Sequence, residues 1–226
     1  MPSSPLPIVV LISGSGSNLQ AIIDAIGTLQ LNAEIKAVIS NKAGVKGLER
    51  AEKAGIPTRV LQHTDFDSRE AFDQALAGLI DDFNPRLVIL AGFMRILSED
   101  FVTHYMGRML NIHPSLLPDF TGLNTHQRVL DAGRSQHGVS VHFVTNELDS
   151  GPLVIQAVID INPEDTADSL AERIHQQEHI IYPTSIQWFA EGRLCWKDNQ
   201  AWLDDKPIRV PPRWQNGQLI YKPDVT

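Results

Sequence analysis

The feature that most constrains this chain is a series of short strand-like segments in its N-terminal half, of which residues 8–12 and 87–91 are uninterrupted apolar runs. They lie at residues 8–12, 35–40, 58–61 and 87–91, and each is followed by a helical pattern of apolar residues. Strands without polar alternation are typical of a sheet that is buried on both faces, and alternating strands and helices favour parallel pairing. The sequence therefore predicts an α/β fold with a Rossmann-like open sheet, mostly parallel in the N-terminal half, with helices on both faces.

The C-terminal half has a different pattern. Residues 137–145 and 153–161 read as two strands joined by a short loop, which favours antiparallel pairing. Thr166 is expected to cap a long helix that Pro183 kinks or restarts, and a small hairpin is expected around Asp198-Asn199. Proline and polar residues dominate 206–226, which predicts a loosely packed tail.

A glycine-rich turn follows the first apolar segment, with the sequence Ser13-Gly-Ser-Gly-Ser-Asn18. A turn of this kind before a helix directs backbone N–H groups and the positive end of the helix dipole at one point, which suits a phosphate. Leu19 occupies the place of the third glycine of a dinucleotide-binding motif, and no P-loop lysine follows. A plain tight turn with Asn18 as the helix N-cap remains the alternative.

Two segments of the N-terminal half could meet a ligand. Asp67 and Glu70 resemble a capping box at the start of a helix, and Arg69 lies in its first turn, where a cation is either solvated or kept for an anion. Gly92 and the bulky residues after it, up to the expected helix cap Ser98, could form the wall of a pocket for a flat ligand or part of the core.

A strand that ends in Asn111-Ile-His113-Pro114 is the strongest candidate for chemistry. Alternate residues of a strand share a face, so the amide and the imidazole are displayed together at a strand end. A carboxylate close to His113 would favour the imidazolium, which can donate to a developing oxyanion beside the Asn111 amide. Asp149 is the preferred acid because it lies in a loop at a strand end; Glu147 and Asp119 remain open, and so does an ordinary turn.

Composition and other motifs exclude several classes of function. The net charge of −8 over 226 residues argues against a nucleic-acid partner, and the single cysteine, Cys195, excludes an internal disulfide. No targeting signal and no apolar run of about 18 residues is present, which predicts a cytoplasmic protein without a membrane partner. His175, Glu178 and His179 match an inverted zinc-protease motif, but no third ligand is identifiable, so no metal is expected.

Several longer motifs resemble the folate-dependent formyltransferase family. They are Asn111-Ile-His-Pro-Ser-Leu-Leu-Pro118, Gly122 with Thr125-His126, His137-Gly-Val-Ser-Val-His142 and Asp149-Ser-Gly-Pro152. Residues 10–20 and 90–97 narrow the resemblance to the branch that acts in purine synthesis. The resemblance covers about residues 8–205, in order; Asn124 departs from it, because many relatives carry histidine there.

The resemblance implies transfer of the formyl group from the co-substrate 10-formyltetrahydrofolate to the amine of N1-(5-phosphoribosyl)glycinamide. It implies that Asn111 orients the formyl oxygen, that His113 stabilises the oxyanion, and that Asp149 supports His113 and helps to relay the proton. Binding roles are implied for the nucleotide at Gly16, Ser17, Asn18 and Glu178, and for the folate at Arg69, Met94, Arg95, Ile96, Leu97 and Asn111.

The resemblance further implies a single formyltransferase domain over residues 1–205. Its parts would be a phosphate-binding half at 1–110 and a catalytic and folate-binding half at 111–205, in a monomer or homodimer with small-molecule substrates. Formyltetrahydrofolate deformylase and transfer to another small amine are alternatives, as is a non-catalytic phosphosugar- or folate-binding module. Methionyl-tRNA formyltransferase carries a further nucleic-acid-binding domain, for which the chain is too short and too acidic.

Overall fold

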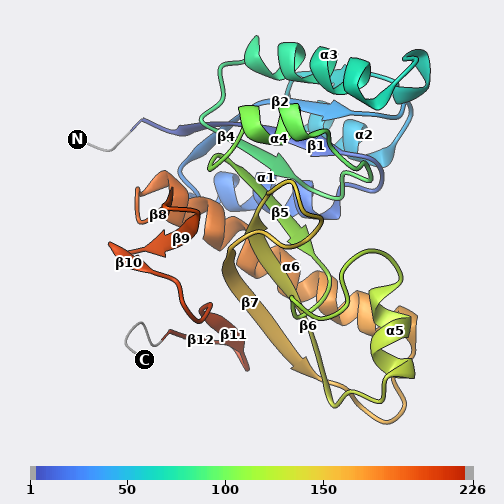
Figure 1. Cartoon of the computed structure of the whole chain (residues 1–226), viewed down its shortest axis with the longest axis vertical. Coiled ribbons are helices and arrows are strands. Elements are labelled where there is room, and N and C mark those ends of the chain that lie inside the picture. The colour runs from blue at the N-terminus through green and yellow to red at the C-terminus, as the bar shows by residue number, and fades with distance from the viewer. Residues whose placement is uncertain (1–3, 222–226) are drawn as a thin grey trace. The chain divides into compact units, whose positions relative to one another are not determined.

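The computed structural model describes residues 4–221, which form two compact units that divide after Asn111 (Figure 1). The first unit contains β1 (Leu6–Ile12), α1 (Ser17–Gly27), β2 (Ala33–Ser40), α2 (Lys46–Lys53), β3 (Thr58–Val60), a 3-10 turn (His63–Asp65), α3 (Arg69–Asp81), β4 (Leu87–Leu90) and α4 (Glu99–His104). Strand β5 (Met109–His113) carries the chain from the first unit into the second.

The first unit is a parallel sheet with the strand order β5, β4, β1, β2, β3. Strand β1 is central because residues 8–12 are fully buried aliphatic side chains, and burial of each such side chain stabilises the fold by about 1.5–3 kcal/mol. The strand order reverses between β1 and β4, and ligands of open α/β sheets bind outside the carboxyl ends of the strands at such a point.

The helices of the first unit pack in two pairs, α1 with α2 and α3 with α4. Their starts differ in part from the sequence predictions. Helix α1 begins directly after Gly16, which is its N-cap at φ +68°, so the alternative in which Asn18 caps the helix is wrong about the cap. Helix α3 is capped by the Ser68 hydroxyl, which accepts from Ala71 N at 3.1 Å, instead of by Asp67. Ser98 caps α4 as predicted.

The second unit is built around the antiparallel pair β6 (Gln136–Phe143) and β7 (Leu153–Asp160), with the long helix α6 (Ala167–Ala190) against both strands (Figure 1). Thr166 caps α6 in a capping box with Ser169, and the helix continues through Pro183 without a break. The unit also contains α5 (Thr125–Asp131), β8 (Leu194–Lys197), β9 (Gln200–Leu203), β10 (Lys206–Pro207), β11 (Arg213–Gln215) and β12 (Gln218–Ile220).

The last described residues are more ordered than the sequence predicts. The hairpin β8–β9 turns at Asp198 and Asn199, both with positive φ, as predicted. Beyond it, β10 pairs with β9, and β11 joins the edge of β7 in parallel while it pairs with β12. Residues 206–221 therefore contain three short strands, and residues 222–226 lie outside the described part of the chain.

The predicted fold class is confirmed: the protein is α/β, with parallel strands in its N-terminal half and an antiparallel core pair in its C-terminal half. Among residues 4–221, no helix is long and apolar enough to cross a membrane.

Candidate active site

Strand β5 places Asn111 and His113 two residues apart at its carboxyl end, just before Pro114. The proline cannot donate to a sheet ladder, so the strand stops there and its last polar side chains stand at the sheet edge. The His113 side chain is nearly enclosed, since the residue is 6% exposed, whereas Asn111 is half-buried. The pattern of two polar side chains on one strand face is therefore present as the sequence predicts.

Asp149 is the acid that reaches His113. One of its carboxylate oxygens, Oδ2, lies 3.4 Å from His113 Nδ1 and also accepts from Gly122 N at 2.9 Å. Asp149 holds this position with φ at +53°, a strained conformation for a residue with a side chain. Of the alternatives, Asp119 pairs with Arg134 at the surface and Glu147 is exposed.

Both nitrogen atoms of the His113 ring face acceptors. Nε2 lies 3.0 Å from the carbonyl oxygen of Phe120, and because a carbonyl can only accept, Nε2 carries a proton. Nδ1 faces the Asp149 carboxylate, whose Oδ2 is the second acceptor, 3.4 Å away. The imidazole ring is therefore held between two hydrogen-bond acceptors.

A second histidine, His142, adjoins the same carboxylate. Its Nε2 lies 4.0 Å from Asp149 Oδ1, while its Nδ1 donates to the carbonyl oxygen of Phe143 at 2.8 Å. Burial lowers the pKa of His142, although the Phe143 carbonyl and the Asp149 charge oppose that shift. No separate role for His142 is predicted from the sequence. Its position could have been noticed because it is a polar residue at the end of an otherwise apolar strand.

The glycine-rich turn is shaped by a contact that the sequence analysis missed. A Cβ on Gly16 would lie 2.6 Å from the Cα of Gly47, and a Cβ on Gly47 would lie 2.5 Å from Ile12 Cδ1. Gly47 N also donates to Gly14 O at 3.0 Å, and Arg50 Nε donates to Ser15 O at 2.9 Å. Helix α2 thus fixes the turn from outside, which leaves the first N–H groups of α1 directed along the helix axis.

The residues expected at the folate lie together in the first unit. Arg69 is the first residue of α3 and pairs with Glu70 at the surface, 3.2 Å apart. Met94 and Ile96 expose 67% and 61% of their surface, and the guanidinium of Arg95 lies over the ring of Phe72 at 5.6 Å. Two large exposed apolar side chains beside two cations suit a flat ligand that carries carboxylates.

Glu178 and the histidines of α6 belong to the second unit. Glu178 is buried, with 5% exposure, and the rings of His175 and His179 stack in parallel at 6.5 Å. Within residues 4–221, no group of three histidine, cysteine or acidic side chains is placed to hold a metal ion. The inverted zinc-protease pattern therefore has no third ligand in the described part of the chain.

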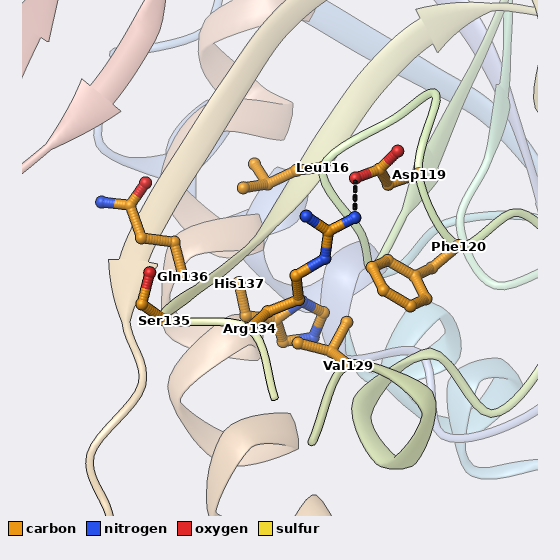
Figure 2. A pocket seen from close by; sticks show the side chains of 8 residues that line it. All are labelled: Leu116, Asp119, Phe120, Val129, Arg134, Ser135, Gln136 and His137. Atoms are coloured by element: carbon orange, nitrogen blue, oxygen red, sulfur yellow. Dashed lines mark hydrogen bonds and ion pairs between the residues drawn. The ribbon is translucent and has the colours of Figure 1, made fainter. Parts of the chain in front are cut away.

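A pocket of the second unit borders the His113 site through Phe120. Figure 2 shows Arg134 extended toward Asp119, with Phe120 and the ring of His137 nearby. His137 Nε2 is 2.9 Å from His126 Nδ1, and burial lowers the pKa of His137 to about 4. The lining residues are Leu116, Asp119, Phe120, Val129, Arg134, Ser135, Gln136 and His137. None of these has a role implied by the resemblance.

Comparisons with known proteins agree on one family. Residues 6–186 match the profile of the family described as formyl transferase. Phosphoribosylglycinamide formyltransferase of Escherichia coli (strain K12) is 56% identical over 206 residues, 91% of this chain and 96% of the relative. The enzyme of that name from Haemophilus influenzae is 47% identical over 201 residues, 89% of this chain and 95% of the relative.

A solved structure shows the same likeness in three dimensions. The phosphoribosylglycinamide formyltransferase of Coxiella burnetii is 58% identical, with a TM-score of 0.87, over 90% of this chain and 95% of that one. The match spans both units, including β5 and the loop that carries Asp149. The chain therefore belongs to the formyl transferase family.

Proposed function

We infer that this chain is an enzyme that transfers a formyl group to the amine of phosphoribosylglycinamide, a step of purine synthesis. Two close relatives are named phosphoribosylglycinamide formyltransferase, and the chain matches nearly their whole length. The observation that supports the chemistry is the His113–Asp149 pair, 3.4 Å apart and almost enclosed, at the end of a strand that also bears Asn111. The formyl donor is a folate, and we propose 10-formyltetrahydrofolate.

We propose the following roles for the three side chains. The neutral amine attacks the formyl carbon, so a carbon–nitrogen bond forms and the carbonyl oxygen becomes an oxyanion. The imidazolium of His113 and the amide of Asn111 donate to that oxygen, since preorganised donors contribute about 10²–10³ in rate. The bond between the formyl carbon and folate N10 then breaks, and the proton lost by the amine reaches N10 with help from Asp149.

The Phe120 carbonyl bears on this mechanism. It accepts a hydrogen bond from His113 Nε2, so donation to the oxyanion requires His113 to exchange that partner for the substrate oxygen. Phe120 has φ at +56° in the loop before Gly122, whose N–H holds Asp149. One loop thus contacts both the imidazole and the carboxylate that supports it.

Substrate binding is proposed at the residues that the resemblance implies. The N–H groups at the start of α1, at Gly16, Ser17 and Asn18, would receive the nucleotide phosphate, and Glu178 would hold the ribose hydroxyls. The folate would contact Arg69 and the backbone and side chains of residues 94–97, with Asn111 near its formyl group. Support comes from the start of α1, where Gly16 is the N-cap and provides no side chain to cap the helix, and from the exposure of Met94 and Ile96.

The proposed setting is a cytoplasmic enzyme with small-molecule substrates, working as a monomer or homodimer. Residues 1–205 would act as one catalytic domain. We propose a phosphate-binding half at 1–110 and a catalytic and folate-binding half at 111–205, with Arg69 and residues 94–97 as further folate contacts supplied by the first half.

An amine-dependence assay tests the proposed function. Purified protein is mixed with 10-formyltetrahydrofolate, with and without phosphoribosylglycinamide, and release of tetrahydrofolate is followed by absorbance. We expect release only with the amine. Equal release without the amine would replace transfer by hydrolysis of the formyl group, as in a deformylase.

A further inference from the structure

We propose that Ser13 and Asp73 are positioning residues for folate. Ser13 follows β1 and Asp73 lies on α3, and each holds one end of the 92–97 segment, which follows β4. The inference rests on the proposed folate role of residues 94–97. Neither residue is exposed to a ligand, since Ser13 is 6% and Asp73 is 1% exposed. Their effect on folate would therefore act through the backbone of the segment.

The first attachment is the Ser13 hydroxyl, directly after β1. It accepts a hydrogen bond from Met94 N at 2.8 Å and donates to Asn41 Oδ1 at 2.6 Å, after β2. Asn41 Nδ2 in turn lies 3.3 Å from His63 Nδ1. One buried hydroxyl therefore joins the ends of β1, β2 and β4, at the point where the strand order reverses and the glycine-rich turn begins.

The second attachment is the Asp73 carboxylate on α3. Its Oδ2 accepts from Ser98 N at 2.5 Å, directly after Leu97. Its other oxygen, Oδ1, is buried and has no hydrogen-bond partner within residues 4–221. Burial raises the pKa of this carboxyl, whereas the Ser98 hydrogen bonds and the charges of Arg69 and Arg95 lower it.

The 92–97 segment depends on such attachments because it has no regular secondary structure. Only Phe93 packs fully into the core, while Met94 and Ile96 are exposed. A buried carboxylate with one unpaired oxygen is costly for folding, and α3 does not need such a group for its own stability. The presence of Asp73 therefore has another explanation. Asp73 contacts Ser98 N and interacts electrostatically with Arg69 and Arg95, so we assign it a role in shaping the proposed folate site.

Steady-state kinetics of single variants test the proposal. Loss of one buried hydrogen bond of this kind corresponds to about tenfold in affinity, so Asp73→Ala and Ser13→Ala should each raise the KM for 10-formyltetrahydrofolate about tenfold. For Asp73→Ala, the KM for the amine should stay within about twofold, because Asp73 accepts from Ser98 N, whereas the glycine-rich turn is held by Gly47 and Arg50 of α2. An unchanged folate KM in both variants would overturn the proposal.

A conservative variant and a matched control separate positioning from general destabilisation. Asp73→Asn keeps a carbonyl oxygen that can accept from Ser98 N, so its KM for folate should stay close to that of the unsubstituted protein. A KM raised as much as in Asp73→Ala would contradict the hydrogen-bond attachment. Tyr105→Phe removes the hydrogen bonds that the Tyr105 hydroxyl donates to Ala77 O and Asp81 Oδ1 near the C-terminal end of the same helix, away from Arg69 and Asp73. It should lower the unfolding midpoint but leave the folate KM unchanged, and a raised KM there would assign the effect to helix stability.

Calorimetry with tetrahydrofolate separates this inference from the proposed function. If the unsubstituted protein binds no tetrahydrofolate, the proposed folate site itself fails. If it binds, and Ser13→Ala and Asp73→Ala bind as tightly, the site stands and the positioning role fails. We expect binding by the unsubstituted protein, and binding about tenfold weaker in both variants.

Discussion

At the scale of single residues, the central relation is between His113 and Asp149. The sequence could place an imidazole and an amide on one strand face, because the period of a strand is two. It could not select among three acids from spacing, because the selection depends on the left-handed backbone of Asp149 and on the Gly122 N–H that holds its carboxylate. His142 was missed for a similar reason, since only the folded loop brings Asp149 beside β6.

Replacing either partner should reduce turnover sharply. His113→Ala removes the proposed oxyanion donor, and Asp149→Asn removes the charge that supports it, so kcat should fall about 10²–10³-fold in each. Nucleotide binding, measured by calorimetry, should persist because the proposed phosphate site is at the start of α1, away from both substitutions. Glu147→Gln, an exposed acid on the same loop, is the matched control; a loss in that variant equal to that of Asp149→Asn would remove the special role of Asp149.

The buried pair His126–His137 should make stability depend on pH. Burial and the neighbouring His126 lower the pKa of His137 to about 4, whereas an unfolded histidine titrates near 6.5. Between these values the unfolded chain binds a proton that the folded chain does not, so the free energy of unfolding should fall as the pH decreases from about 6.5 to 4. The loss from this group is at most roughly 3 kcal/mol.

Denaturant titrations at several pH values measure this dependence. His137→Gln should show a shallower fall in the free energy of unfolding over that range. His104→Gln is the control, because it changes an exposed histidine that pairs with Asp81. The free energy of unfolding of this variant should fall with the same slope as that of the unsubstituted protein. Equal slopes for His137→Gln and the unsubstituted protein would show that His137 does not contribute.

At the scale of elements, strand–turn–helix order was predictable and the shape of the turn was not. The glycines at 14 and 16 indicate a tight turn after β1, but Gly47 lies on α2, more than 30 residues further along the chain. Its role follows from close backbone approach between two elements, which no local pattern encodes. The capping of α3 by Ser68 is a smaller case, because serine and aspartate are comparable N-caps and stand side by side.

Two helical glycines should respond oppositely to alanine. In Gly47→Ala the new Cβ would meet Ile12 Cδ1 at 2.5 Å and Gly14 O at 3.1 Å, so the turn must shift. We expect lower stability and a raised KM for the phosphorylated amine. Gly78→Ala, on α3, meets nothing within 4 Å and should stabilise the protein by about 0.5–1 kcal/mol. Thermal unfolding and kinetics of both variants check this; an unaffected Gly47→Ala would contradict the proposed contact.

At the scale of the whole molecule, the fold class followed from the sequence because strand composition reports burial directly. Continuous apolar runs predicted the parallel strands. Alternating apolar residues and a short connecting loop predicted the antiparallel pair. The tail was different: β11 pairs with β7 through only two residues, and its partner lies more than 50 residues earlier in the chain. Short edge strands with proline and polar residues look like loops in sequence, so their pairing emerged only from the structure.

The proposed reaction transfers a single carbon to an amine, and an isotopic label follows that carbon directly. Purified protein is supplied with 10-formyltetrahydrofolate labelled with ¹³C in the formyl group, together with phosphoribosylglycinamide, and carbon NMR is recorded. The label should appear as a formamide on the amine of the nucleotide, with tetrahydrofolate released in equal amount. Appearance of the label as formate, with the amine unchanged, would contradict the account.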